Sequence, residues 1–236
     1  MRIDKFISEC GVASRKEAAR AARCGGITVN GVAVKDVSAH IDPESAKVVF
    51  LGRELRYRAF TYVMLNKPEG YVSATEDSRF PPVTDLLPPE LRKMELFPVG
   101  RLDKDTVGMM ILTNNGKLAH ALLSPKHHVK KEYYFEAAEP LPPGVEDRFA
   151  SGIILGDGYE CKSAEIALSG ERDRGVIGLT EGKYPQIKRM IASENNRVVF
   201  LERISFAGIP LDRSLSRGEW RYLSDAEISA IEALGI

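Results

Sequence analysis

The chain has 236 residues, of which 44% are hydrophobic and 28% are charged, proportions that are ordinary for a folded globular protein. No apolar run is long enough to cross a bilayer, and the first residues lack the apolar core of a signal peptide. The three cysteines are far apart and odd in number, so they form neither a disulfide framework nor a CxxC metal pair. These features predict a cytoplasmic protein with one large domain or two smaller ones.

The first part of the chain predicts two short helices followed by a β-hairpin. The segment 4–11 has a short apolar centre and ends at a glycine. A second helix begins at Ser14, which a glutamate follows three residues later, as in a capping box. Asn30-Gly31 lies between alternating residues and predicts a tight hairpin turn. The polar segment 53–59 then predicts a linker.

Charge is distributed unevenly along the chain. Residues 1–58 hold 11 Lys+Arg and 7 Asp+Glu, a net charge of +4, whereas the remainder holds 22 and 26, a net charge of −4. The second helix presents most of its basic side chains on one face: Arg15, Lys16, Arg20 and Arg23. A basic module on a mildly acidic body suggests a polyanionic partner, although a solvated basic helix has the same pattern.

From Tyr62 onwards the pattern changes to apolar strands joined by turns and short helices. The segment 61–74 predicts a strand that Lys67-Pro68 interrupts, and 109–113 predicts a short buried strand. The segment 114–125 predicts a turn followed by a helix that a proline ends. A strand at 130–140, apolar or alternating runs at 152–156, 161–170, 174–182 and 196–210, and helices in the second half of 181–196 and at 224–235 complete the pattern.

The stretch GRLDKDTVG at 100–108 is the unusual one, because it sets two cations and two carboxylates between apolar segments. These charged side chains either belong to a solvent-exposed loop or take part in a chemical reaction. The four histidines share no ligand spacing with cysteines or acids, so we expect no metal site. The sequence contains no Walker loop, no GxGxxG after a strand and no GxSxG elbow, so nothing indicates a nucleotide cofactor.

Four segments in order resemble the bacterial ribosomal RNA pseudouridine synthases. They are MLNKPEGYVSAT at 64–75, the charged loop with its sequel at 100–116, SPKHHVKKEYYF at 124–135 and EGKYPQIKRM at 181–190. The adjacent histidines and the K-R-M ending are most similar to the small-subunit, RsuA-like branch. The resemblance implies an enzyme that isomerises uridine to pseudouridine, most simply in 16S ribosomal RNA, without a cofactor.

The N-terminal segment 1–48 resembles the S4-like RNA-binding domain found in many proteins that modify ribosomal RNA. In that family the basic second helix and the turn after it contact the phosphate backbone. The resemblance implies that RNA phosphates bind the basic side chains of this segment: Arg2, Lys5, Arg15, Lys16 and Arg20. Such contacts hold and orient RNA without reading its sequence.

The resemblance also assigns roles to residues of the body. Asp103 matches the catalytic carboxylate, and Lys188 matches the late basic residue that pairs with it, where several relatives have arginine. Tyr133 matches the tyrosine that lies against the target uracil, and its hydroxyl can assist proton transfer. Arg101 matches the arginine that fills the gap left by the flipped base.

Other charged residues allow more than one interpretation. Lys183 and Arg189 fit phosphate contacts better than catalytic roles. Asp105 fits a hydrogen-bonding loop residue better than a second catalytic acid. Lys67 either touches RNA or forms part of a structural turn.

The sequence therefore predicts an α+β protein with an S4-like domain at 1–58 and a catalytic domain at 61–236, built on a long, mostly antiparallel sheet. We expect a monomer that binds ribosomal RNA and no membrane. Three alternatives remain open: a large-subunit ribosomal RNA synthase, a non-catalytic ribosome-assembly protein on this fold, and a glycoside hydrolase. A non-catalytic RNA-binding protein gains nothing from an acid that faces phosphates. A glycosidase needs paired carboxylates and an aromatic groove, whereas this chain has one tryptophan.

Overall fold

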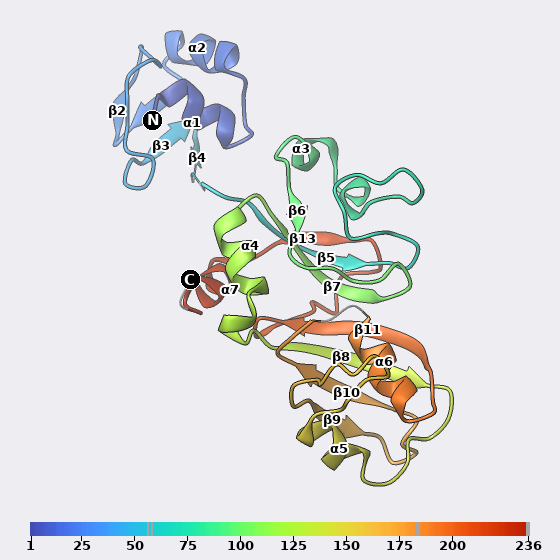
Figure 1. Cartoon of the computed structure of the whole chain (residues 1–236). Coiled ribbons are helices and arrows are strands. Elements are labelled where there is room, and N and C mark those ends of the chain that lie inside the picture. The colour runs from blue at the N-terminus through green and yellow to red at the C-terminus, as the bar shows by residue number, and fades with distance from the viewer. Residues whose placement is uncertain (56, 58, 183–184, 235–236) are drawn as a thin grey trace. The chain divides into compact units, whose positions relative to one another are not determined.

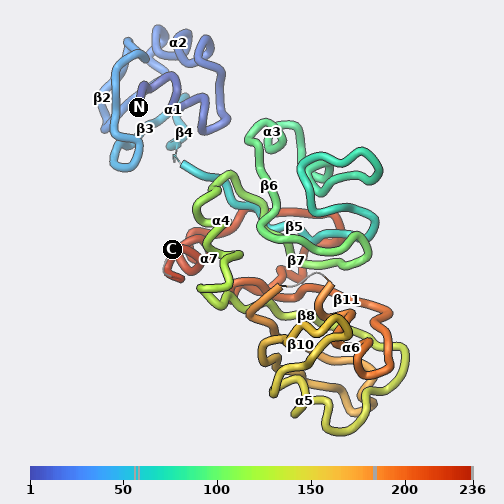
Figure 2. The backbone as a smooth tube through the Cα atoms, in the orientation of Figure 1, coloured from blue at the N-terminus to red at the C-terminus, as the bar shows by residue number. Residues whose placement is uncertain are grey.

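The computed structural model describes residues 1–55, 57, 59–182 and 185–234. Its contacts divide the chain into two compact units, Met1–Phe60 and Thr61–Ile236. The first unit has a hydrophobic core of its own, and the second has one on each side of a large sheet. Figures 1 and 2 trace the chain through each unit.

The first unit consists of two helices and a small sheet with the strand order β2-β1-β3-β4. Its elements are α1 (Ile3–Glu9), α2 (Arg15–Arg23), β1 (Ile27–Val29), β2 (Val32–Ala33), β3 (Val48–Phe50) and β4 (Arg53–Leu55). Phe6 and Ile7 of α1, Ala18 of α2 and Val48 of β3 are fully buried together in its core. The apolar sides of both helices therefore close one side of this sheet.

Local signals in this unit are confirmed. The Ser14 side chain accepts a hydrogen bond from the backbone N–H of Glu17, and the Glu17 carboxylate accepts one from Ser14, so both halves of the capping box are present. Asn30 and Gly31 have φ of 51° and 82°, the left-handed conformations that a tight hairpin turn between β1 and β2 requires.

The prediction of a linker at 53–59 is wrong for its first residues. Arg53–Leu55 forms β4, which pairs antiparallel with β3 so that Leu55 lies opposite Val48. Leu55 is buried, whereas Arg53 and Glu54 are exposed. A short edge strand can have only one side chain that faces the core. The polar composition of this segment therefore resembles that of a linker, although the segment belongs to a sheet.

The second unit is built on a nine-stranded sheet. Seven strands follow the order β13-β5-β7-β11-β8-β10-β9, while β6 pairs with β7 and β12 with β11. The strands are β5 (Tyr62–Lys67), β6 (Phe97–Pro98), β7 (Val107–Thr113), β8 (Lys131–Ala137), β9 (Glu165–Leu168), β10 (Arg174–Leu179), β11 (Val198–Phe206), β12 (Ile209–Pro210) and β13 (Trp220–Tyr222). All neighbours are antiparallel except β7 and β11. The predicted α+β class with a mostly antiparallel sheet is confirmed.

Helices cover both faces of this sheet. They are α3 (Pro89–Arg92), α4 (Gly116–Leu123), α5 (Val145–Ser151), α6 (Gln186–Ser193) and α7 (Asp225–Glu232), with 3-10 turns at Val83–Leu86 and Pro125–His127. One core contains side chains of α3, α5 and α6, and the other contains side chains of α4 and α7. In Figure 1, α6 lies next to the half of the sheet that contains β8, β10 and β11. The apolar run at 152–156 forms no strand, only an isolated bridge between Ile154 and Glu160.

The loop that carries the charges is shorter than the segment 100–108, because Val107 and Gly108 already belong to β7. Gly108 has φ of +102°, and a Cβ added there would lie 2.4 Å from the backbone oxygen of Arg203 on β11. A glycine at position 108 therefore allows β7 and β11 to pair in parallel, with Gly108 opposite Arg203. This pairing brings the loop next to β11.

Replacing Gly108 by alanine should destabilise the catalytic unit by about 3 kcal/mol, because the new Cβ meets backbone that cannot move aside and the φ is strained. The melting temperature of this unit, measured by calorimetry, should fall by roughly 6–12 °C. Gly116→Ala is the matched control, since Gly116 has no positive φ and a Cβ there would meet nothing within 4 Å. Equal melting temperatures for both variants would contradict the packing argument.

Candidate active site

One buried lysine holds the backbone of the charged loop through hydrogen bonds. Lys67, at the end of β5, is 0% exposed. Its Nζ donates hydrogen bonds to the backbone oxygens of Thr106 (2.7 Å), Asp103 (3.0 Å) and Lys104 (3.3 Å), as well as to that of Pro68. Burial lowers the pKa of Lys67 to about 8, and the nearby carboxylates oppose this shift. Of the two interpretations of Lys67, the structural one agrees with these contacts.

The turn after β5 holds the same loop at two further points. The hydroxyl of Ser73 donates to the backbone oxygen of Leu102 and accepts from its N–H, both at 2.8 Å. The N–H of Gly70 donates to the backbone oxygen of Lys104. The loop backbone is thus tied on both sides of Asp103, so the orientation of its carboxylate depends on few free torsions.

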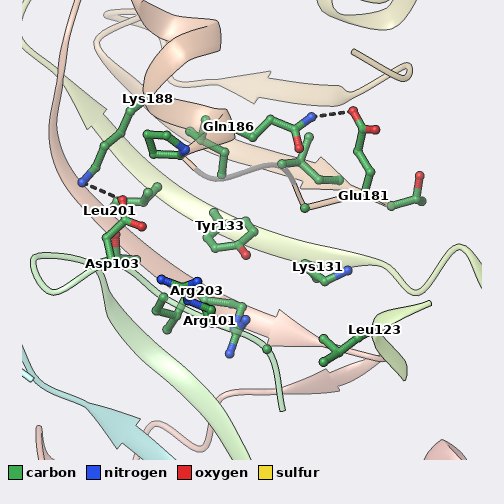
Figure 3. A pocket seen from close by; sticks show the side chains of 18 of the residues that line it. Arg101, Asp103, Leu123, Lys131, Tyr133, Glu181, Gln186, Lys188, Leu201 and Arg203 are labelled. Atoms are coloured by element: carbon green, nitrogen blue, oxygen red, sulfur yellow. Dashed lines mark hydrogen bonds and ion pairs between the residues drawn. The ribbon is translucent and has the colours of Figure 1, made fainter. Parts of the chain in front are cut away.

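Asp103 and Lys188 form an ion pair across the site. Lys188 Nζ, on α6, lies 2.9 Å from Asp103 Oδ2, and the Asp103 side chain is 14% exposed. The same ammonium donates to both oxygens of Asp105 at 2.6 and 2.8 Å. One cation therefore neutralises only part of the charge of two carboxylates. Figure 3 shows Lys188 reaching towards Asp103 from α6.

The pKa values of this cluster follow its ion pairs. Burial lowers the pKa of Lys188, but the hydrogen bonds and charges of Asp105 and Asp103 outweigh it, so that the pKa is raised. Burial likewise raises the pKa of Asp105, but the hydrogen bonds and charge of Lys188 outweigh it, so that this pKa is lowered. Lys188 and Asp105 are therefore both charged at neutral pH. Asp105 is a loop hydrogen-bonder, as its sequence position suggested, and its partner is Lys188.

Tyr133 is placed by strand register. On β8 it lies opposite Arg203 of β11, and Lys131 lies two residues earlier on the same face of the strand. Tyr133 is 9% exposed. In the view of Figure 3 the Tyr133 ring lies between the side chains of Lys188 and Arg101.

A cavity of about 640 Å³ collects these groups within the second unit. Asp103, Tyr133, Lys188 and Arg101 all line it, together with apolar residues of β10, α6 and β11. Its volume is that of a site for a ligand of nucleotide size. The structure therefore brings together four of the residues that the resemblance singled out.

The remaining predicted RNA contacts lie elsewhere. Arg189, the neighbour of Lys188, forms an ion pair with Asp157 and does not line this cavity. Lys183 lies outside the described residues. In the first unit Arg2 pairs with Asp4 at 2.8 Å and Lys5 pairs with Glu9 at 3.5 Å.

The basic face of α2 is open to solvent. Arg15, Lys16, Arg20 and Arg23 are exposed, whereas Ala18 and Ala22 are buried. The helix thus anchors on its alanines and presents four cations outward, as a phosphate-binding surface requires.

Several cavity residues escaped the sequence reasoning. Glu181, at the cavity wall, is 8% exposed and accepts hydrogen bonds from Tyr159 Oη (2.8 Å), Gln186 Nε2 (2.6 Å) and the Lys162 N–H (2.9 Å). These contacts tie the end of β10 to the start of α6 and so position Lys188. The hydrogen bond to Glu181 raises the pKa of Tyr159 to about 12.

Lys131 and Arg203 are two further cavity residues to which sequence reasoning gave no role. Lys131 stands in the K-x-Y segment and Arg203 in a long apolar run, and both line the cavity. The available signal was the position of Arg203 inside an apolar strand. Burying a charged side chain costs free energy, so such a residue usually has a structural or functional role.

Comparison with known proteins identifies the family. Residues 61–193 match the RNA pseudouridylate synthase family, and residues 1–46 match the S4 domain. The chain is 42% identical over 232 residues to an uncharacterised RNA pseudouridine synthase of Bacillus subtilis, YtzG, covering 97% of both chains. It is 35% identical over 232 residues to ribosomal small subunit pseudouridine synthase A of Escherichia coli K12, covering 98% of this chain and 100% of the relative.

A solved structure agrees with these relatives. A crystal structure of a pseudouridylate synthase matches with a TM-score of 0.69 and 35% identity, over 98% of this chain and 99% of that one. The chain therefore belongs to the RNA pseudouridine synthases, enzymes that isomerise uridine within RNA, and it contains an S4 domain. Both resemblances noted in the sequence are confirmed.

Two further observations concern the described residues alone. No helix among them is long and apolar enough to cross a membrane. Within the same ranges, no cluster of three or more His, Cys, Asp or Glu side chains could hold a metal ion.

Proposed function

We propose that this protein converts one specific uridine of small-subunit ribosomal RNA to pseudouridine, with Asp103 as the catalytic carboxylate. The observation that carries the catalytic part is the Asp103 carboxylate, held by Lys188 at 2.9 Å in the wall of a cavity that Tyr133 also lines. The small-subunit target is supported by the relatives named ribosomal small subunit pseudouridine synthase A. The protein acts as a monomer in the cytoplasm.

The reaction determines what each group does. The target nucleotide leaves the RNA stack and enters the cavity, because its glycosidic bond is out of reach in a paired strand. Asp103, ionised, attacks the sugar carbon or takes a sugar proton as the bond to N1 breaks. The base turns and its C5 bonds to C1′; this displaces Asp103 from the sugar carbon or, on the second route, is accompanied by return of the sugar proton from Asp103. The C5 proton then leaves, and N1 gains a proton. Atoms and electrons balance without a redox partner, so the reaction needs no cofactor.

The other residues bind and orient RNA in this proposal. Residues 1–58 form the domain that holds the phosphate backbone, and residues 61–236 form the catalytic domain. Arg101 fills the gap that the flipped base leaves. Lys183 and Arg189 contact RNA phosphates, and Arg189 then exchanges Asp157 for a phosphate.

The test is to map pseudouridines in ribosomal RNA from cells with and without this protein. We expect one position of small-subunit RNA to lose its modification, and to regain it when the wild-type gene is returned. Loss of a large-subunit position would contradict the target, and unchanged maps would favour the non-catalytic assembly protein.

Tyr133→Phe and Tyr133→Leu separate stacking from proton transfer. The phenylalanine variant should bind RNA as well as wild type while its single-turnover rate falls by roughly 10²-fold, because the hydroxyl that assists proton transfer is lost. The leucine variant should lose affinity as well. Identical affinities and rates for both variants would show that the ring does not stack on the base.

Deleting residues 1–60 tests the role of the first unit. Because each unit has its own core, the remainder should fold, but its affinity for RNA should fall roughly tenfold or more and its salt dependence should flatten. The matched variant keeps the domain and replaces Arg15, Lys16, Arg20 and Arg23 by glutamine. An unchanged slope of log affinity against log salt in both would refute phosphate binding by α2.

A further inference from the structure

The floor of the cavity contains hydrogen-bond donors that the protein leaves unused. Arg203 is 1% exposed, and its Nε donates to the backbone oxygen of Met109 at 2.6 Å. Its Nη2 is buried and has no hydrogen-bond partner among the described residues. The Thr106 hydroxyl, on a residue that is 2% exposed, is the other buried side-chain atom without a partner in those ranges. Buried donors without partners are rare in folded proteins unless a ligand completes them.

Lys131 adds a second cation to the same floor. Its Nζ donates to the backbone oxygen of Val129 at 3.1 Å, and an ammonium has further N–H groups for a ligand. The Lys131 ammonium and the Arg203 guanidinium lie 5.6 and 5.0 Å from the centre of the Phe206 ring. Burial, with the charge of Arg203 adding to it, lowers the pKa of Lys131 to about 8.

Neither cation has an ion pair with a carboxylate among the described residues. The carboxylates of the cavity are already engaged, since Asp103 pairs with Lys188 and Glu181 accepts three hydrogen bonds. A buried and a half-buried cation near one another, without a carboxylate partner, cost stability, so this arrangement implies a ligand that carries negative charge or exposed oxygens.

The ligand is identified by where these donors lie. Arg203 is directly opposite Tyr133 across the β8–β11 pair, and Lys131 is on the same face of β8. In the view of Figure 3 the two side chains lie on different sides of the Tyr133 ring. A base that stacks on this ring therefore directs its edge at the donors. A phosphate of the RNA backbone belongs at the open mouth of the cavity, where water also reaches it.

We propose that Arg203, Lys131 and Thr106 form a subsite that binds the carbonyl oxygens of the target uracil and stabilises the uracil anion between bond cleavage and rejoining. This inference rests on the proposed function. When the bond between C1′ and N1 breaks, its electron pair goes to the base, and the charge spreads over N1, C5 and both carbonyl oxygens. The charge remains there until C5 bonds to C1′.

Such donors accelerate cleavage because they bind the anion more strongly than the neutral ring. The donors are fixed before substrate arrives, since β8 and β11 hold them and Nε of Arg203 is anchored to β7 through Met109. They also keep the free base in place while it turns.

The experiment compares two RNA substrates under single turnover, one with uridine at the target and one with 5-fluorouridine. Fluorine withdraws electrons and makes the base a better leaving group, so its anion needs less help. Arg203→Met and Lys131→Met should consume the uridine substrate roughly 10²–10³-fold more slowly than wild type. Their defect on the fluorinated substrate should be at least about tenfold smaller. Equal defects on both substrates would overturn the proposal.

Thr106→Val serves as the variant that keeps the fold. Valine has the shape of threonine, and the hydroxyl that it removes has no partner in the free protein, so the melting temperature should not fall. The rate on uridine RNA should nevertheless fall roughly tenfold. A wild-type rate in this variant would remove Thr106 from the subsite and contradict the proposal as stated.

RNA affinity distinguishes the base from a phosphate as the ligand. If Arg203 bound a phosphate, Arg203→Met would weaken binding and reduce the salt slope by about one contact. We expect the slope to be unchanged. A reduced slope would overturn the uracil subsite while leaving the proposed function intact. Failure of the wild-type enzyme to form pseudouridine would instead refute the proposed function itself.

Discussion

Asp103→Asn should abolish pseudouridine formation, with a fall in the single-turnover rate of roughly 10⁴-fold or more, while RNA binding survives. The amide has the size of the carboxylate and can still face Lys188, but it can neither attack the sugar nor take a proton. The loop should keep its shape, because Lys67 and Ser73 hold it through backbone atoms and not through the Asp103 side chain.

Asp105→Asn is the matched control for this experiment. It removes an equal charge two residues along the same loop, from a side chain that is 59% exposed, and it leaves the Asp103–Lys188 pair in place. We expect its rate to stay within about tenfold of wild type. Appreciable turnover by Asp103→Asn, or equal losses in the two variants, would refute Asp103 as the catalytic carboxylate.

Lys188→Met should lower the rate at neutral pH by roughly 10²–10³-fold, with partial recovery as the pH is raised. Without the ammonium, two carboxylates of one loop face each other in a partly buried site, and protonation of one of them becomes favourable. The acidic limb of the pH–rate profile should therefore move to higher pH. The sign follows from the wild-type cluster, where Lys188 holds the pKa of Asp105 below its usual value.

Lys188→Arg is the control, since a guanidinium can also face a carboxylate, and it should keep substantial activity. Single-turnover profiles of both variants are the measurement, because product release then does not mask the chemical step. A loss of equal size at every pH in Lys188→Met would mean that Lys188 only binds phosphate. Asp103 would then need a different partner, and Arg101, which lies two residues earlier and lines the same cavity, is the candidate.

Local sequence signals predicted local structure well. The helix cap at Ser14 and the turn at Asn30-Gly31 depend on side chains and torsions within a few residues, and both are present in the structure. The fully buried strands β5 and β7 were visible as apolar runs. The edge strand β4 was not, because only one of its residues faces the core.

The site could be predicted only in part. The order of four motifs indicated Asp103, Tyr133 and Lys188, and the resemblance also implied that Asp103 and Lys188 pair, but it gave no further partners of these residues. Asp105 as a second partner of Lys188 depends on the packing of α6 over the loop, which no local pattern contains. Lys67 remained ambiguous for the same reason, since its acceptors are backbone oxygens of a loop that is remote in the sequence.

The sequence by itself determined the α+β class, the helix cap at Ser14, the hairpin turn and the family, because these rest on periodicity, local hydrogen bonds and motif order. Only the tertiary structure decided which charges meet beyond the Asp103–Lys188 pair that the family resemblance implied. The parallel pairing of β7 with β11 sets the loop of Asp103 beside Arg203, and the pairing of β8 with β11 sets Arg203 opposite Tyr133. The physical reason is that a buried charge is stable only with partners supplied by distant segments, and strand order selects those segments.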